Sequence, residues 1–147
     1  GIANRRAAEA AMGIAHARGA PLAVVAFDVD RFKAINDQHG HAIGDQILIA
    51  VAGALSGTAR GPDTVARWGG EEFVALIDGP LAGGRAYAER ARAAVAALVA
   101  ALVAGVTVSA GVVAVAPGEH PMAALARADQ HLYEAKRQGR DRVVADA

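Results

Sequence analysis

The sequence predicts an α/β domain in which helices pack against a central mixed sheet. Residues 22–29, LAVVAFDV, form an almost unbroken apolar run, which is typical of a central strand buried on both faces. Residues 65–77 read as a β-hairpin around a Gly-Gly pair, and segments with helical periodicity separate the strands. No linker, repeat or low-complexity tract interrupts the 147 residues, so we expect one domain over residues 1–147.

The first half of the chain predicts a helix, the central strand and a second helix. Residues 3–18 are rich in alanine and are expected to form a helix that Gly19 and Pro21 end. Gly44 is expected to begin the second helix. Its core stripe recurs at every fourth residue, namely Ile43, Ile47, Val51 and Leu55.

The second half predicts the hairpin and four further elements. Gly69-Gly70 is expected to be the two-residue turn of the hairpin. There follow a helix over 82–104, a strand over 106–116, a helix over 121–138 that Gly139 ends, and a short edge strand over 142–145. In sheets covered by such crossover helices, ligands gather at strand ends and tight loops.

Composition excludes several classes of function. Lys plus Arg and Asp plus Glu both number 15, whereas a general binder of nucleic acid or anionic membranes usually carries a basic excess. The chain has no cysteine, which excludes disulfides and cysteine-ligated zinc. We therefore expect no nucleic-acid partner and a cytoplasmic domain.

One uncharged run, residues 93–116, is long enough to cross a bilayer. Most of its residues are Ala, Gly, Ser, Thr or Val, so the free energy of transfer into lipid is modest. Gly105 is typical of a helix end, and Val106 to Ser109 then alternates like a strand. We interpret the run as a helix end followed by a buried strand.

Acidic residues mark the end of the central strand and the hairpin turn. Asp28 and Asp30 end the strand, and Glu71 and Glu72 follow the Gly-Gly pair. If the strand and the hairpin are neighbours, Asp28 and Glu71 meet at one edge of the sheet and repel each other unless a cation lies between them. Oxygen ligands without cysteine favour a hard ion such as magnesium. Solvated acids at strand ends are also common, and these residues alone leave that alternative open.

Four separated motifs resemble those of one known family. Trp68-Gly-Gly-Glu-Glu-Phe73, preceded by Arg67, resembles the GGDEF/GGEEF signature. Residues 27–48, FDVDRFKAINDQHGHAIGDQIL, and residues 124–143, ALARADQHLYEAKRQGRDRV, resemble two further family signatures. GIANRR at the start resembles the opening motif. The chain therefore resembles the GGDEF-domain diguanylate cyclases over essentially its whole length.

This resemblance implies a nucleotidyl-cyclase-like fold and a specific reaction. Two GTP molecules, held antiparallel between two domains, would become cyclic di-GMP and two pyrophosphates, so a homodimer is expected for catalysis. Each 3′-hydroxyl would attack the α-phosphate of the other GTP. The implied cofactor is Mg²⁺ (or Mn²⁺), which neutralises the growing charge and polarises the attacking oxygen.

The resemblance also assigns roles to the acidic residues. It implies that Asp28, Glu71 and the backbone carbonyl of Val29 ligate the metal. Glu72 would support the metal or the 3′-hydroxyl, and the sequence leaves open which carboxylate acts as the base. Asp30 matches a family position of less certain role, for which a solvated or salt-bridged acid is an equal alternative.

Asn36 and Asp45 match the family's guanine-reading pair. A carboxylate can accept hydrogen bonds from guanine N1–H and the 2-amino group, and an amide can both donate and accept. The structural alternatives are a turn role for Asn36 and a helix-dipole role for Asp45. The other implied substrate-binding residues are Phe32, Lys33, Arg67, Gly69, Gly70, Lys136 and Arg140.

Arg60-Gly-Pro-Asp63 begins nine residues before Gly69, as in the family's product-inhibition site. Arginine can bind guanine or phosphate with two hydrogen bonds, and aspartate can accept from guanine. Arg60 and Asp63 are therefore candidates to bind cyclic di-GMP, with Arg90 or Arg92 from a partner domain. A simple turn is the alternative, because Arg-x-x-Asp often occurs by chance.

An active cyclase and a catalytically weak domain that senses GTP or cyclic di-GMP are the two main hypotheses. The residues that degenerate members usually lose are present, namely Asp28, Glu71, Glu72, Lys136 and Arg140, which favours the enzyme. A purely structural dimerisation domain is a third hypothesis, which nothing in the sequence favours. The chain begins inside the opening motif, so we expect a sensory or regulatory segment before it, which could anchor the full-length protein to a membrane.

Overall fold

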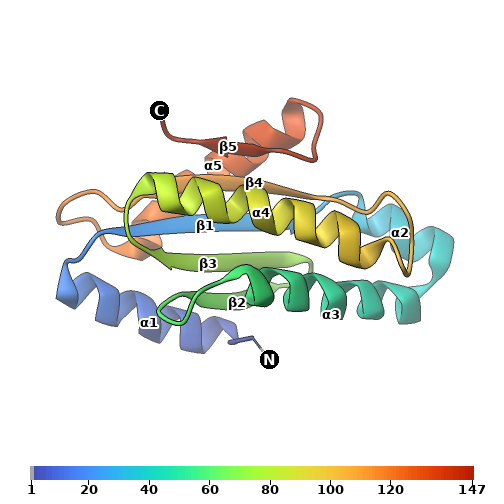
Figure 1. Cartoon of the computed structure of the whole chain (residues 1–147), viewed down its shortest axis with the longest axis horizontal. Helices are drawn as coiled ribbons and strands as arrows, with labels where there is room; N and C mark the ends of the chain where they lie inside the picture. Colours follow the sequence, from blue (N-terminus) through green and yellow to red (C-terminus); the bar gives the residue numbers. More distant parts are fainter. Residues whose placement is uncertain (1) are drawn as a thin grey trace.

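The computed structural model describes residues 2–147. The elements are α1 (Arg5–Arg18), β1 (Leu22–Val29), α2 (Phe32–His39), α3 (His41–Thr58), β2 (Thr64–Gly69), β3 (Glu72–Asp78), α4 (Leu81–Val99), β4 (Val108–Ala114), α5 (Pro121–Arg137) and β5 (Val143–Ala145). Figure 1 shows the helices arranged around one central sheet.

The sheet has the strand order β2-β3-β1-β4-β5, with β1 at its centre. β1 is antiparallel to both β3 and β4, whereas β5 pairs with β4 in parallel. The predicted mixed sheet is therefore confirmed. β1 also lies beside the hairpin, which is the arrangement that the proposed meeting of Asp28 and Glu71 requires.

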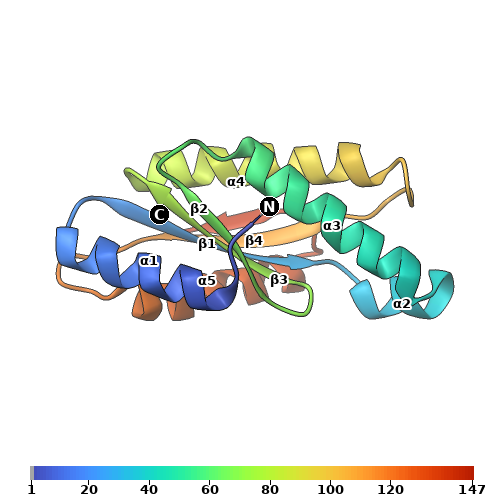
Figure 2. The same ribbon diagram turned by 90° about the horizontal axis from the view of Figure 1, so that it is seen from below.

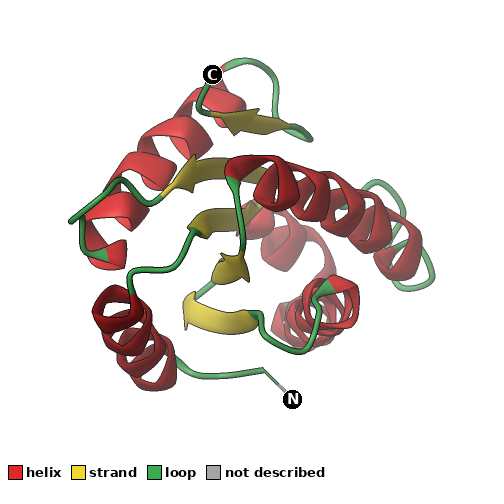
Figure 3. Ribbon diagram, turned by 60° about the vertical axis from the view of Figure 1, so that its left-hand side comes forward, coloured by secondary structure: helices red, strands yellow, loops and turns green. Residues whose placement is uncertain are grey.

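Helices cover both faces of the sheet, with α3 and α4 on one face and α1 and α5 on the other (Figures 2 and 3). Side chains of β1 alternate between the two cores: Val25 and Phe27 enter the first, and Val24 and Ala26 enter the second. This alternation explains why residues 22–29 are almost continuously apolar. α2 lies beyond the end of β1 and buries none of its residues.

The segment between β1 and β2 holds two helices, so the expectation of a single helix there is wrong. The unpredicted α2 starts after Arg31, which has a φ of 54° and provides no side-chain cap. Gly40, with a φ of 88°, separates α2 from α3. α3 therefore starts at His41, and Gly44 does not begin it. Gly44 is instead buried in the first turn, where an added Cβ would overlap Oδ1 of Asn36.

The hairpin turn also differs from the prediction by one residue. A bulge between Arg67 and Gly69 shifts the register, so that Gly69 pairs with Glu72. Gly70 and Glu71 therefore form the turn, and Gly70 adopts a positive φ of 51°, which glycine tolerates without strain. This shift places the backbone of Glu71 directly at the tip of the hairpin.

The uncharged run ends α4 and forms β4, as interpreted from the sequence. α4 ends at Val99 instead of continuing to 104, and the carbonyl oxygen of Val99 accepts hydrogen bonds from the amides of Leu102 and Val103 in the turns that follow. β4 is correspondingly shorter than 106–116. No helix within residues 2–147 combines the length and the apolar character needed to cross a membrane.

α5 packs directly on β4 at Gly111. A Cβ at this position would overlap the carbonyl oxygen of Ala128 and the amide nitrogen of Leu132, both in the backbone of α5. Neither group can yield without displacing the helix. The position of α5, and of the side chains at its end, thus depends on having glycine at position 111 of β4.

We predict that Gly111→Ala destabilises the domain by about 1–3 kcal/mol, because the added methyl group overpacks the contact between β4 and α5. Urea unfolding measures the change. Gly53→Ala is the matched control: Gly53 is an exposed residue inside α3 with open space around its Cα. That control should gain roughly 0.5–1 kcal/mol. Equal stabilities of the two variants would contradict the packing argument.

Candidate active site

The end of β1 and the hairpin turn bring three carboxylates to one place. The register between β1 and β3 places Asp28 opposite Glu72. The amide of Val29 donates a hydrogen bond of 3.2 Å to the carbonyl oxygen of Glu71, which ties the turn to the strand end. The predicted approach of Asp28 to the Glu71-Glu72 pair is therefore observed.

Arg67 holds the turn from the other side of the hairpin. Its Nε donates a hydrogen bond of 2.9 Å to the carbonyl oxygen of Gly70. Gly70 in the turn and Gly69 just before it have open space around their Cα atoms. A bulky ligand can therefore approach the backbone of the turn closely.

Electrostatic interactions at this place favour an added cation. The pKa of Asp28 is raised from 3.8 to about 6: burial is the largest cause, the charge of Lys136 opposes the shift, and the charges of Glu71 and Glu72 add to it. Nζ of Lys136 lies 3.5 Å from Oδ1 of Asp28 and 3.5 Å from Oδ1 of Asp30. Lys136 thus divides one positive charge between two carboxylates.

Asp30 has a structural role in this geometry. Its side chain is only 4% exposed, and it accepts hydrogen bonds from Oγ1 of Thr107 and Oγ of Ser109, each at 2.7 Å. The amide of Asp141 donates a third hydrogen bond of 3.1 Å to it. The geometry therefore favours the salt-bridged structural alternative for Asp30.

The donor set predicted for the metal fits a hard cation. Asp28 and Glu71 supply carboxylates, and Val29 supplies a backbone carbonyl at the same strand end. All three are oxygen donors, as Mg²⁺ and Mn²⁺ prefer. Among residues 2–147, no group of three or more His, Cys, Asp or Glu side chains is arranged to hold a metal. The predicted donor set instead combines two carboxylates with one backbone carbonyl.

A cavity of about 720 Å³ lies between the N-terminal segment, α3 and the hairpin. Asp45, Arg67 and Gly69 line it, so three of the predicted substrate-binding residues share one space. Ile2 and Leu48 add apolar walls that the sequence reasoning missed. Both lie inside family motifs, but no pattern in the sequence distinguishes them from core residues.

The N-terminal segment is held against this cavity by backbone contacts. Ala3 forms a parallel bridge to Ala66, with hydrogen bonds of 3.0 Å to the backbone of Val65 and Arg67. These bonds hold Ile2 in the lining of the cavity, to which Asp45 also belongs. Apolar walls with a few polar groups are typical of small-molecule sites.

Asn36 lies against the start of α3 with an unsatisfied acceptor. Its Oδ1 is buried near Gly44, and no group within the described chain donates a hydrogen bond to it. A buried acceptor without a donor costs free energy, and Asn36 is not among the residues that line the cavity with Asp45.

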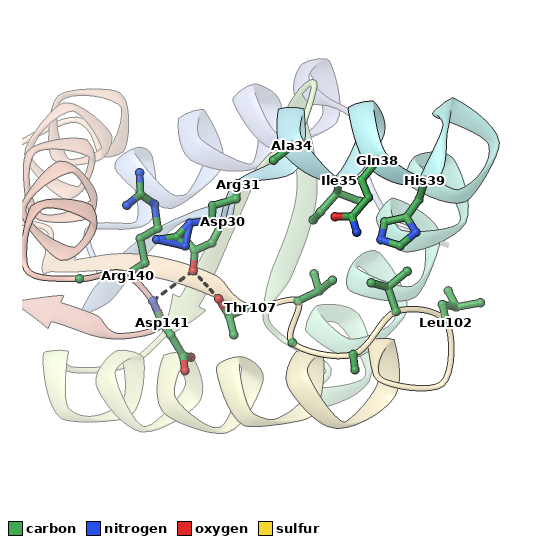
Figure 4. A pocket seen from close by; sticks show the side chains of 15 residues that line it. Asp30, Arg31, Ala34, Ile35, Gln38, His39, Leu102, Thr107, Arg140 and Asp141 are labelled. Atoms are coloured by element: carbon green, nitrogen blue, oxygen red, sulfur yellow. Dashed lines mark hydrogen bonds between the residues drawn. The ribbon is translucent and has the colours of Figure 1, made fainter.

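A second cavity, also of about 720 Å³, lies between α2, the loop 100–107 and the turn after α5. In Figure 4, Arg31 and Arg140 lie at one end of it, and Ile35 and Leu102 lie at the other. Lys33, which is exposed, follows Arg31 closely in the first turn of α2.

The first turn of α2 also contains Phe32, which is half-buried and packs against the core shared by α3 and α4. Lys136 lies between Asp28 and Asp30. With Arg31, Lys33 and Arg140, it places several positive groups around the end of β1. The arrangement is suited to an extended anion such as a polyphosphate.

The predicted product-binding pair lies at the other end of the hairpin from the turn. Asp63, whose side chain is 2% exposed, accepts hydrogen bonds of 2.9 Å from the amides of Arg60 and Asp78. Arg60 donates to the carbonyl oxygen of Asp78 at 3.0 Å, and its side chain remains 64% exposed. Asp63 thus fastens the loop to β3, while Arg60 faces solvent.

Comparison with known proteins identifies the family. The family model described as "Diguanylate cyclase, GGDEF domain" matches residues 1–142. The chain therefore belongs to the GGDEF domain family. It is 45% identical over 132 residues to the diguanylate cyclase DgcP of Pseudomonas aeruginosa, a match that covers 87% of this chain and 20% of DgcP.

Two solved structures share the fold along almost the whole chain. The GGDEF domain of DgcB from Caulobacter crescentus, in complex with c-di-GMP, has a TM-score of 0.88 and 32% identity, covering 98% of this chain and 88% of that one. The active GGEEF domain of a diguanylate cyclase from Vibrio cholerae has a TM-score of 0.87 and 31% identity, covering 99% and 97%.

The predictions of the family and the fold are confirmed by these matches. The chain spans less than half the length of the curated relatives it matches, from 20% to 44% in the cases of DgcP and of VdcA from Vibrio cholerae. The roles of individual residues remain predictions.

We predict that Asp28→Asn stabilises the metal-free protein at neutral pH. The pKa of Asp28 is about 6 in the folded state and 3.8 in the unfolded state, so the folded state holds the proton more tightly. Its contribution to stability is fully present below about pH 4 and is lost as the pH rises through about 6. Above about pH 7 the variant should therefore gain roughly 1–3 kcal/mol over the native protein.

Urea unfolding in a metal chelator, repeated across this pH range, measures the effect. Asp37→Asn is the control, since Asp37 is an exposed carboxylate on α2. A difference between Asp28→Asn and the native protein that stays constant from about pH 4 to about pH 8 would exclude the proposed titration.

Proposed function

We propose that this chain is the catalytic domain of a diguanylate cyclase, which condenses two GTP molecules into cyclic di-GMP and two pyrophosphates. One observation carries the proposal: Asp28 meets the Glu71-Glu72 turn beside the cavity that Asp45 lines. This juxtaposition provides acidic groups for phosphoryl transfer next to a space of nucleotide size.

The guanine base would occupy the cavity next to α3. The carboxylate of Asp45 would accept from N1–H and the 2-amino group, and the amide of Asn36 would contact the base after turning away from Gly44. Ile2 and Leu48 would flank the planar base. Adenine lacks both of the donors that Asp45 requires, so the site favours GTP over ATP.

The triphosphate would extend toward the end of β1. Lys33, Lys136 and Arg140 would neutralise its charge, and the amides at the start of α2 would add donors. Mg²⁺ or Mn²⁺, when bound by Asp28, Glu71 and the Val29 carbonyl, would stabilise the charge that develops on the phosphates. Transfer of the 3′-hydroxyl proton to a carboxylate accompanies formation of the bond to phosphorus and release of pyrophosphate.

Condensation requires two copies of the domain. One copy provides one set of these groups and therefore holds one GTP. Two copies must face each other so that each 3′-hydroxyl reaches the α-phosphate held by the other. A homodimer with twofold symmetry meets this requirement, because the two half-sites are then equivalent.

We predict that the purified chain converts GTP to cyclic di-GMP in the presence of Mg²⁺, with a specific activity that rises with protein concentration. Glu71→Gln should lower the rate by about 100-fold or more, because it removes a charge from the metal site. Chromatography of the products measures this, with Glu9→Gln, an exposed carboxylate of α1, as the control. GTP binding without any cyclic di-GMP formation would favour the sensor alternative instead.

We further propose that Arg60 binds cyclic di-GMP as an inhibitor. Its guanidinium is exposed beside a loop that Pro62 stiffens and Asp63 fastens to β3. The carboxylate of Asp63 already accepts two backbone hydrogen bonds, so its contribution to product binding would require rearrangement of the loop. Arg90 is the better candidate for the partner contact, since Arg92 is engaged by Asp141 and Glu89.

We predict that Arg60→Ala weakens inhibition by cyclic di-GMP by about 10- to 100-fold, the effect of losing one charged hydrogen bond. The rate at low product concentration should not change, because Arg60 lies far from the turn. Titration of product against the native protein, Arg60→Ala and the exposed control Arg6→Ala measures the shift. Superimposable curves for all three would mean that the Arg-x-x-Asp segment is only a loop anchor.

A further inference from the structure

The turn after α5 adopts a backbone conformation that side chains rarely tolerate. Arg140 and Asp141 are consecutive, neither is a glycine, and their φ angles are 67° and 46°. Such residues persist only where surrounding contacts hold them, and they cluster at functional sites. The contacts of this turn therefore decide where the side chain of Arg140 lies.

Three elements hold the turn. The amide of Arg140 donates to the carbonyl oxygen of Ala135 at 3.0 Å, which ties the turn to α5. The amide of Asp141 donates to Oδ2 of the buried Asp30 at 3.1 Å, which ties it to β1. Oδ1 of Asp141 accepts a hydrogen bond of 2.8 Å from Nη1 of Arg92, which ties it to α4.

Arg92 reaches the turn from the opposite face of the sheet. α4 covers one face and α5 the other, so Arg92 spans the edge at which β5 lies. Its side chain is 27% exposed, and its second terminal nitrogen is 3.1 Å from Oε2 of Glu89 on the same helix. This helix contact aligns the guanidinium toward Asp141.

We propose that Arg92 is a positioning residue for Arg140. By holding the side chain of Asp141, it stabilises the turn that places Arg140 at one end of the cavity shown in Figure 4. The inference rests on the proposed function, in which Arg140 contacts the triphosphate. It adds that α4, a helix remote from the phosphates, takes part in binding them.

The experiment measures the binding of two nucleotides by calorimetry. The first is 3′-deoxy-GTP, which cannot condense because it lacks the attacking hydroxyl. The second is GMP, which lacks the β- and γ-phosphates. Arg92→Ala should weaken binding of 3′-deoxy-GTP by about 3- to 10-fold and leave GMP binding within about twofold.

Variants on both sides of the contact sharpen the test. Asp141→Ala should reproduce the effect of Arg92→Ala, whereas Asp141→Asn should retain most of the affinity, because asparagine keeps an oxygen acceptor and tolerates positive φ. Arg85→Ala is the matched control, an exposed arginine on the same helix, and should change neither affinity. In an Arg140→Ala background, Arg92→Ala should add nothing.

Two results would overturn the inference. One is equal weakening of both nucleotides by Arg92→Ala, which would mean a general effect on the fold. The other is an undiminished effect of Arg92→Ala in the absence of Arg140. Failure of the native protein to bind 3′-deoxy-GTP would instead refute the proposed function, and the inference with it.

Discussion

The buried carboxylate of Asp30 is the constraint on which the site depends. A buried charge is costly unless its oxygens are satisfied, and Asp30 accepts from Thr107, Ser109 and the amide of Asp141, with Lys136 at 3.5 Å. These partners come from the start of β4, from the turn after α5 and from α5 itself. All three elements are attached to the end of β1 through Asp30, so their positions relative to one another are fixed. Contacts at the surface could not fix them in this way.

The central position of β1 explains why one strand can organise both the core and the chemistry. Its alternating side chains enter two hydrophobic cores, so the strand is held on both faces. Where it emerges at Asp28, the same backbone register that pairs it with β3 sets the distance to Glu72. The carboxylates therefore approach each other because of strand pairing. Burial first, and then the charges of Glu71 and Glu72, raise the pKa of Asp28, and the stability of the sheet sustains this arrangement.

Much of the fold follows from the sequence because hydrophobic patterns report burial. The buried strand, the hairpin and α5 are strongly patterned, and all three were predictable. α2 was not, because it buries no residue and begins without a side-chain cap. The exact residues of the hairpin turn were not predictable, because they depend on a bulge between Arg67 and Gly69. Only the pairing of β2 with β3 reveals that bulge. Likewise, the motif identified Asp28 and Glu71, but only tertiary contacts distinguish the structural Asp30 from them and place Ile2 beside Asp45.

The geometry of the hairpin limits how the proposed control could work. Arg60 lies before β2 and Glu71 lies in the turn after it, so the strand of six residues separates them by about 20 Å. A ligand held by Arg60 therefore does not compete for the space that a nucleotide would occupy at the turn of the same domain. If two copies each hold one substrate, as proposed, a ligand that changes how the copies face each other is sufficient to stop the reaction. Control through the relative placement of domains requires no rearrangement within the tightly constrained end of β1.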